Sequence, residues 1–287
     1  MEQPCMAKPF RIRRPKPLNT PQAGVPVVAR LLTGVVGAVC LVWALWAGRE
    51  AAACALLAAF SFLGVLEFFQ AAGLGRRVGL GILVGLLVLT SATFEPETFL
   101  VAYGLSLTCL WLFYPLRRED PSRLLVRLSL ETTGFVYASL PFIALGMLLR
   151  TDGGLGWLVY LLFVVWMADV GGFVFGRLFG RHRVFAMSPS KTLEGFLGGV
   201  CSSALASWLA AWVGLVEGGV PWAVWPFLGA ALGVLGALGD LFESFLKRAL
   251  GIKDFGRSLP GHGGVLDRVD SLVFSSWALL LLRRIGL

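Results

Sequence analysis

Charged side chains gather in residues 244–271, SFLKRALGIKDFGRSLPGHGGVLDRVDS, beside the last apolar run of the chain. Asp267 and Asp270 are three residues apart, so on a helix their carboxylates would lie on one face. Two such acids can chelate one cation, and they can equally be first-turn acids that interact with the helix dipole. Cations that could neutralise phosphate oxygens flank them: Lys247, Arg248, Lys253 and Arg268. The stretch therefore combines candidate metal ligands with candidate phosphate ligands.

Further acids interrupt long apolar runs, Asp169 in VVWMADVGGFVFGRLFG and Asp240 in GALGDLFESFLKR. At about 1.5 Å of rise per residue, Asp169 lies roughly 21 Å into its run and Asp240 roughly 27 Å into its own. A carboxylate at the centre of a membrane helix costs about 2.5–3.5 kcal/mol by insertion scales. An interhelical ion pair or a protonated acid would also explain Asp169, and a solvated amphipathic helix end would also explain Asp240. Glu243 is open between a site residue and a solvated i,i+4 partner of Lys247.

Four of these acids come from three separate apolar runs, and we expect them to meet at one membrane boundary: Asp169, Asp240, Asp267 and Asp270. Hard carboxylate oxygens with few soft or imidazole partners favour Mg²⁺. Magnesium of this kind keeps several waters and shares itself with substrate phosphates. A second, monovalent ion stays open, because the sequence does not indicate one.

Further polar residues fit a polyphosphate ligand. Lys191 lies in SPSKTLEG, just before an apolar run, and Ser244 shares a helical face with Asp240. In PGHGG, Gly263 and Gly264 would let backbone N–H groups approach a phosphate. His262 could donate to the same phosphate or have a structural role.

The elements that must position these residues are membrane helices. The chain is 57% hydrophobic and 15% charged, whereas a soluble domain carries about 25% charged residues. Lipid leaves backbone groups no partner outside their own segment, so each apolar run predicts a helix. The runs are 26–47, 51–71, 79–94, 97–116, 129–149, 155–179, 196–215, 222–248 and 264–285. We therefore predict an all-α, polytopic integral membrane protein with about nine transmembrane helices.

The distribution of positive charge predicts the orientation. With the N-terminus inside, 21 of the 25 Lys and Arg residues fall on the inner side, which is the side that positive charge favours. The exceptions are Arg49, Arg150, Arg283 and Arg284. We expect the N-terminus and the site to face the cytoplasm from the cell (inner) membrane. Topology accounts for the net charge of +8, so a nucleic-acid partner is not indicated.

Three regions follow from this arrangement within one membrane-embedded unit. Residues 1–24 are polar, rich in proline and basic, and predict a cytoplasmic tail. Residues 25–150 would form the N-terminal transmembrane helices. Residues 151–287 would form the C-terminal helices that carry the catalytic residues.

The stretch 244–270 resembles the signature of the phosphatidate cytidylyltransferases, also called CDP-diacylglycerol synthases. That pattern runs S-x-apolar-K-R, four residues, K-D, a small residue, a proline, H-G-G and D-R-x-D, and this chain fills it without a gap. GDLFES, ADVGGFVFGRLFG and SPSKTLEG also resemble family segments, so the likeness covers about residues 165–275. Two positions differ: Ser190 stands where the family usually has lysine, and Phe173 where it often has an aromatic hydroxyl.

The resemblance implies that CTP and phosphatidate react to give CDP-diacylglycerol and pyrophosphate at the surface of the lipid bilayer. Asp240, Asp267 and Asp270 would hold Mg²⁺, with Asp169 as a further ligand or a close neighbour. Lys247, Arg248, Lys253 and Arg268 would neutralise phosphates during catalysis. The expected substrate-binding residues are Lys191, Ser244, His262, Gly263 and Gly264.

Other functions remain to be weighed against this one. Acids beside glycines within a membrane also occur in secondary transporters, but transporter sites lie near the midplane and these acids lie toward one face. A CDP-alcohol phosphotransferase would carry D-G-x-x-A-R, which is absent. A purely structural membrane subunit leaves the acids unexplained. The oligomeric state is open, and a homodimer is one option.

Overall fold

The computed structural model describes most of the chain after the first predicted span. The described residues are 50–75, 78–91, 95–112, 114–117, 119–184, 188–216, 219–256, 258 and 263–286. The predicted tail 1–24, the predicted span 26–47 and His262 lie outside them.

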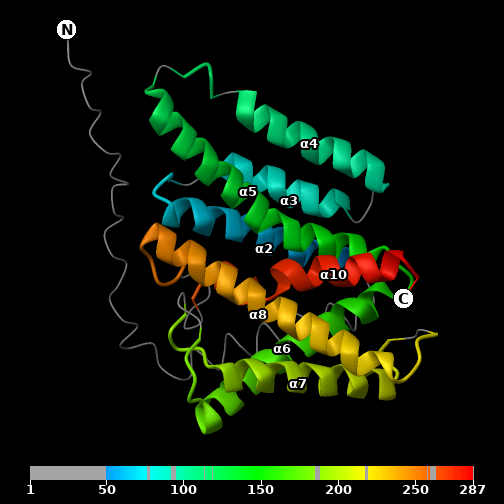
Figure 1. Cartoon of the computed structure of the whole chain (residues 1–287). Helices are drawn as coiled ribbons and strands as arrows, with labels where there is room; N and C mark the ends of the chain where they lie inside the picture. Colours follow the sequence, from blue (N-terminus) through cyan, green and yellow to red (C-terminus); the bar gives the residue numbers. More distant parts are fainter. Residues whose placement is uncertain are drawn as a thin grey trace.

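The described residues contain helices and no β-strand, which confirms the all-α prediction (Figure 1). The helices are α2 (Glu50–Ala71), α3 (Val78–Ser91), α4 (Pro96–Leu112), α5 (Pro121–Leu149), α6 (Gly154–Phe179), α7 (Leu193–Trp212), α8 (Val224–Leu250), α9 (Leu266–Val269) and α10 (Leu272–Arg284). Local signals set several of their ends. Asp120 caps α5 by accepting from the Arg123 N–H, Thr192 caps α7 in the same way, and Gly251 ends α8 in the left-handed conformation.

Within the described part of the chain, five helices are long and apolar enough to cross a membrane, namely α2, α5, α6, α7 and α8. Helices α3 and α4 are apolar but have only 14 and 17 residues, and a span needs about 20. The structure therefore agrees with a polytopic membrane protein. The predicted number of nine spans is not confirmed.

The segment predicted as the last span, residues 264–285, is not one helix. It consists of the four-residue α9 and the 13-residue α10, separated by Asp270 and Ser271. The Asp270 carboxylate accepts the backbone N–H of Ser271 at 2.9 Å, and such local bonds compete with helix continuation. Asp270 thus lies at a turn between two helices.

The helices form two groups that α10 joins. Helices α2, α3, α4 and α5 lie in the upper half of Figure 1, and α6, α7 and α8 lie in the lower half. Helix α10 lies between α5 and α8 and contacts both, while α9 contacts α2. The predicted boundary at residue 150 falls in the connection between α5 and α6. The core joins both groups through large buried rings, among them Phe68, Phe135, Trp157 and Tyr160.

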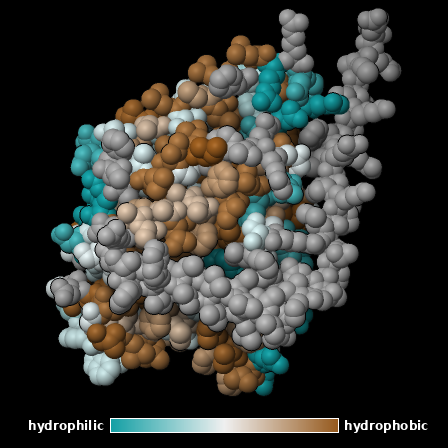
Figure 2. Space-filling view, turned by 180° about the vertical axis from the view of Figure 1, so that it is seen from behind, coloured by the Kyte–Doolittle hydropathy of each residue, from teal (hydrophilic) through white to brown (hydrophobic). Residues whose placement is uncertain are grey.

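Polar segments lie at the two ends of the helices. Figure 2 shows hydrophobic residues across the middle of the molecule and hydrophilic residues toward its two lateral edges. The C-terminal ends of α6 and α8 and the N-terminal end of α7 lie together at the left of Figure 1. At the other end, Arg150 pairs with Glu95 at 2.9 Å and Arg283 lies over the Trp157 ring. Both arginines are at helix C-termini, where the dipole favours cations.

Candidate active site

A cavity of about 710 Å³ lies at the end of the bundle where α6, α7 and α8 meet the turn between α9 and α10. Its walls include all four aspartates predicted as metal ligands and two of the predicted cations. These residues are Asp169, Lys191, Asp240, Asp267, Arg268 and Asp270. Side chains that are far apart in the sequence are therefore brought around one space.

Three acids in and beside this cavity form a tight cluster. Carboxylate oxygens of Asp240, Glu243 and Asp270 all lie within 4.8 Å of one another. Carboxylates this close repel one another unless a cation or a proton compensates their charge. Glu243 Oε1 is buried and has no hydrogen-bond partner in the part of the chain that the structure describes. A cluster that crowds negative charge and leaves a buried oxygen unsatisfied has the ligand set of a hard divalent cation such as Mg²⁺.

A lysine that lies just before α7 contacts this cluster. The Lys191 ammonium contacts the Asp240 carboxylate, and each side chain keeps nearly a third of its surface exposed. Lys191 directly precedes Thr192, the residue that caps α7. The helix start therefore fixes a cation at the mouth of the cavity, where it could also reach an anionic ligand.

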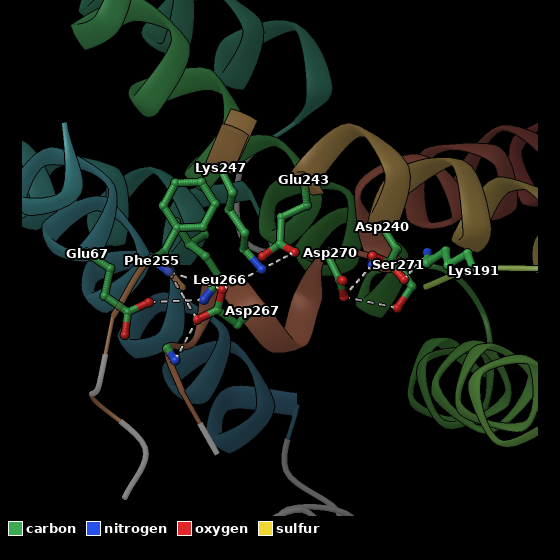
Figure 3. A network of polar contacts seen from close by, with 11 residues as sticks. Glu67, Lys191, Asp240, Glu243, Lys247, Phe255, Leu266, Asp267, Asp270 and Ser271 are labelled. Carbon is green, nitrogen blue, oxygen red and sulfur yellow. Dashed lines mark hydrogen bonds and ion pairs between the residues drawn. The ribbon is translucent and has the colours of Figure 1, made fainter. Parts of the chain in front are cut away.

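Lys247 is bound between two buried acids (Figure 3). Its ammonium lies 2.5 Å from Glu243 Oε2 and 2.7 Å from Asp267 Oδ1. The side chains of these residues are 14%, 2% and 8% exposed in the order Lys247, Glu243, Asp267. The predicted i,i+4 contact of Glu243 and Lys247 exists, but it is buried and not solvated. Lys247 therefore links the acid cluster to α9.

Asp267 has a different environment from Asp270. Its carboxylate accepts the Gly264 N–H at 2.8 Å and the Phe255 N–H at 3.2 Å, besides pairing with Lys247. Burial alone would raise the pKa of Asp267, but the Lys247 ammonium and these N–H groups hold it below its usual value. The two acids were expected to share one cation. The structure places Asp270 in the acid cluster and Asp267 against Lys247 and the preceding loop.

The other predicted residues lie at different distances from the cavity. Asp169 is open to the cavity. Arg248 and Lys253 are exposed at the end of α8 and in the loop after it, and Ser244 is partly buried. Gly263 has a φ of 86°, which a glycine adopts without strain, and Gly264 is buried. Among the cavity-lining positions are Phe173 and Ser190, the two that differ from the family pattern.

Sequence reasoning missed one buried acid near the site, Glu67 in GVLEFFQ of α2. It accepts the backbone N–H groups of Val265 and Leu266 at 3.0 and 3.1 Å. A lone acid within an apolar run was the available signal. Nothing in the sequence relates it to a segment almost 200 residues later.

A glycine of α8 lets Asp270 approach. A Cβ atom at Gly239 would lie 2.3 Å from the backbone oxygen of Asp270. We expect Gly239→Ala to displace Asp270 and to lower the activity proposed below by about 10²-fold, the cost that misplacement by about 1 Å can have.

Initial rates of the purified variant would test this expectation. Gly104→Ala on α4 is the matched control, because a Cβ there meets nothing within 4 Å. Equal rates for the two variants would contradict the proposed constraint on Asp270.

The fold and the cavity together define a polytopic helical membrane protein that holds an acidic and basic polar site at one end of its helices. Comparison with known families gives the specific assignment. The chain belongs to the cytidylyltransferase family, whose model matches residues 28–285.

Curated relatives match over part of their length. A phosphatidate cytidylyltransferase of Staphylococcus haemolyticus is 40% identical over 156 residues, and one of Staphylococcus aureus is 38% identical over 154. One of Staphylococcus epidermidis is 38% identical over 155 residues. Each match covers 52% of this chain and 58% of the relative. The chain thus aligns with little more than half the length of these relatives.

Proposed function

We propose that this protein is a phosphatidate cytidylyltransferase, which converts CTP and phosphatidate to CDP-diacylglycerol and pyrophosphate in phospholipid biosynthesis. The reaction would depend on Mg²⁺ and take place at the cytoplasmic face of the cell membrane. The observation that carries the proposal is the convergence of four aspartates, a lysine and two arginines around one cavity in a member of the cytidylyltransferase family. The relatives' shared name supports the choice of phosphatidate. A homodimer stays a prediction.

The chemistry needs no activated serine or cysteine. An oxygen of the phosphatidate phosphate attacks the α-phosphorus of CTP, and the bond from that phosphorus to the bridging oxygen breaks. The electron pair leaves with pyrophosphate. A phosphomonoester is largely ionised near neutral pH because its second pKa is about 6. The main barrier is the repulsion between two anions, so charge neutralisation and alignment are the protein's contribution.

The side chains have separate roles in this proposal. Asp240, Glu243 and Asp270 would hold the ion, directly or through water, with Asp169 close by. A bound Mg²⁺ would supply positive charge close to the phosphate oxygens. Lys191 and Arg268 line the cavity and would bind phosphate oxygens. Lys247 and Asp267 would fix the position of α9 relative to the acid cluster through their buried ion pair.

The walls of the cavity suit a lipid as well as a nucleotide. Beside its charged residues it is lined by Trp166 and Phe173 of α6, which are 49% and 66% exposed. Exposed aromatic rings on a helix that can span a membrane are compatible with contact to acyl chains. A phosphatidate could thus enter from the bilayer while CTP enters from water.

One experiment tests the proposed reaction directly. Purified protein in detergent is incubated with labelled CTP, phosphatidate and Mg²⁺, and the lipid fraction is analysed for a liponucleotide. We expect a labelled lipid and stoichiometric pyrophosphate, and neither product after chelation of the metal. Uptake of a solute by sealed vesicles without consumption of CTP would favour a transporter instead.

Asp267→Asn tests the anchoring of α9. The amide keeps the size of the carboxylate but loses its charge against Lys247, so we expect the transfer rate to fall by about 10²-fold. The variant should still purify as a folded membrane protein. Retention of most activity would show that the reaction does not depend on the charge of Asp267.

A further inference from the structure

Glu67 connects the N-terminal helices to the segment that carries the candidate catalytic residues. Its side chain belongs to α2 and is 4% exposed. Its two oxygens accept the backbone N–H groups of Val265 and Leu266. Figure 3 shows the bond to Leu266. These N–H groups lie at the start of α9, where a helix lacks internal acceptors for its first donors. A buried carboxylate of α2 therefore completes the hydrogen bonding of α9.

The same carboxylate contacts the chain before α9. A Cβ atom at Gly256 would lie 2.6 Å from three Glu67 side-chain atoms, and one at Gly264 would lie 2.6 Å from Glu67 Oε2. Only glycines let the backbone come this close on both sides. Glu67 thus touches both ends of the segment 256–264.

Neighbouring residues of α2 strengthen this connection. The Phe68 ring stacks on Phe255 with 5.6 Å between centroids. A Cβ at Gly64 would lie 2.9 Å from the Leu266 side chain. One face of α2 therefore holds the loop and α9 through polar and apolar contacts.

From this anchor the contacts continue to the cavity. Gly264 donates to Asp267, and Asp267 pairs with Lys247 beside the acid cluster. Glu67 itself is not among the residues that line the cavity. A displacement of α9 would move Asp267, Arg268 and Asp270 together.

We propose that Glu67 is a positioning residue, whose carboxylate holds Gly256, Gly264 and α9 so that the acids and Arg268 keep their arrangement. The activity part of its test rests on the proposed cytidylyltransferase function. The structural part does not.

Hydrogen exchange measured by mass spectrometry tests the structural part in detergent. Glu67→Gln keeps the shape of the side chain, but its amide nitrogen cannot accept an N–H. We expect at least about 10-fold faster exchange in residues 263–271 and unchanged exchange in α5, because local opening need not involve the whole fold. Unchanged exchange in 263–271 would overturn the proposal.

Ser61→Ala is the matched control, since Ser61 is also buried on α2 and donates to the Ala138 carbonyl at 2.7 Å, away from the loop. It should leave exchange in residues 263–271 at the wild-type level. A similar increase in both variants would mean a general loosening of α2 and would also count against the proposal.

A double-variant comparison tests the link to catalysis. Glu67→Ala and Gly256→Ala should each lower kcat by about 10²-fold with a smaller change in KM, since the geometry and not the binding groups is altered. Removal of the Glu67 side chain frees the space that a Gly256 methyl needs, so the double variant should lose less than the product of the two effects. Fully multiplicative losses would contradict a shared role. If the wild type transfers no cytidylyl group while the exchange result holds, the proposed function fails and the positioning role stands.

Discussion

Replacing Asp270 by asparagine is expected to reduce cytidylyl transfer by about 10³-fold, the upper end of what loss of one electrostatic group in an active site costs. Asp270 belongs to the cluster with Asp240 and Glu243, so the variant removes one charged ligand from the candidate metal site. It also relieves repulsion among carboxylates, because oxygens of Asp240 and Asp270 lie within 4.8 Å of each other. The variant should therefore be at least as stable as the wild type without Mg²⁺. Turnover and thermal unfolding, each measured across a Mg²⁺ titration, would test both expectations.

The same substitution at the other end of the bundle provides the control. Asp152 is exposed in the connection between α5 and α6, so Asp152→Asn should keep the wild-type rate and the stabilisation by Mg²⁺. Stabilisation by Mg²⁺ that persists unchanged in Asp270→Asn would place the ion elsewhere. Wild-type turnover in Asp270→Asn would show that the reaction does not need the Asp270 carboxylate.

Lys247→Ala is expected to destabilise the protein by about 3–5 kcal/mol, the cost of leaving buried charge without its partner. Lys247 is the ion-pair partner of both Glu243 and Asp267, and the side chains of these acids are 2% and 8% exposed. Removal of the lysine leaves two carboxylates close together in a buried site. Unfolding by a denaturing detergent, followed by circular dichroism, would measure the loss.

Two variants show whether buried charge is the cause. Lys253 is exposed, and Lys253→Ala should change the free energy of unfolding by less than about 0.5 kcal/mol, as surface substitutions do. Adding Glu243→Gln to Lys247→Ala removes one of the stranded charges and should recover part of the stability. Equal destabilisation by Lys247→Ala and Lys253→Ala would falsify the buried-bridge interpretation.

The convergence of the acids could be predicted because it depends on the depth of each residue in the membrane. Helix rise converts a position in an apolar run into a distance along the membrane normal. Asp169 and Asp240 lie at such positions, and the structure places both in the wall of one cavity with Asp267 and Asp270. The motif around Asp267 is dense enough to indicate the family. The depth of the acids in the membrane and the motif around Asp267 together thus indicate the candidate site.

The depth of a residue in the membrane does not predict which side chains face one another. Glu243 could be a solvated partner of Lys247 or a site residue. Only the folded contacts show that Glu243 is buried and that its partner Lys247 also pairs with Asp267. The contact between Glu67 and Val265 spans 198 positions and has no local signal. The break between α9 and α10 lies at Asp270, whose carboxylate accepts the Ser271 N–H, in a stretch whose hydrophobicity alone predicts a continuous span.

For the proposed reaction, the short final helix has a consequence for how a lipid would reach the site. At about 1.5 Å per residue, the 13 residues of α10 extend roughly 20 Å, whereas the hydrocarbon layer is about 30 Å thick. If Arg284 marks the far surface, Asp270 lies about 10 Å beneath the near one. A phosphate group must then descend below the plane of its neighbouring headgroups, or the bilayer must thin around the protein. Local membrane deformation would in that case be part of substrate capture.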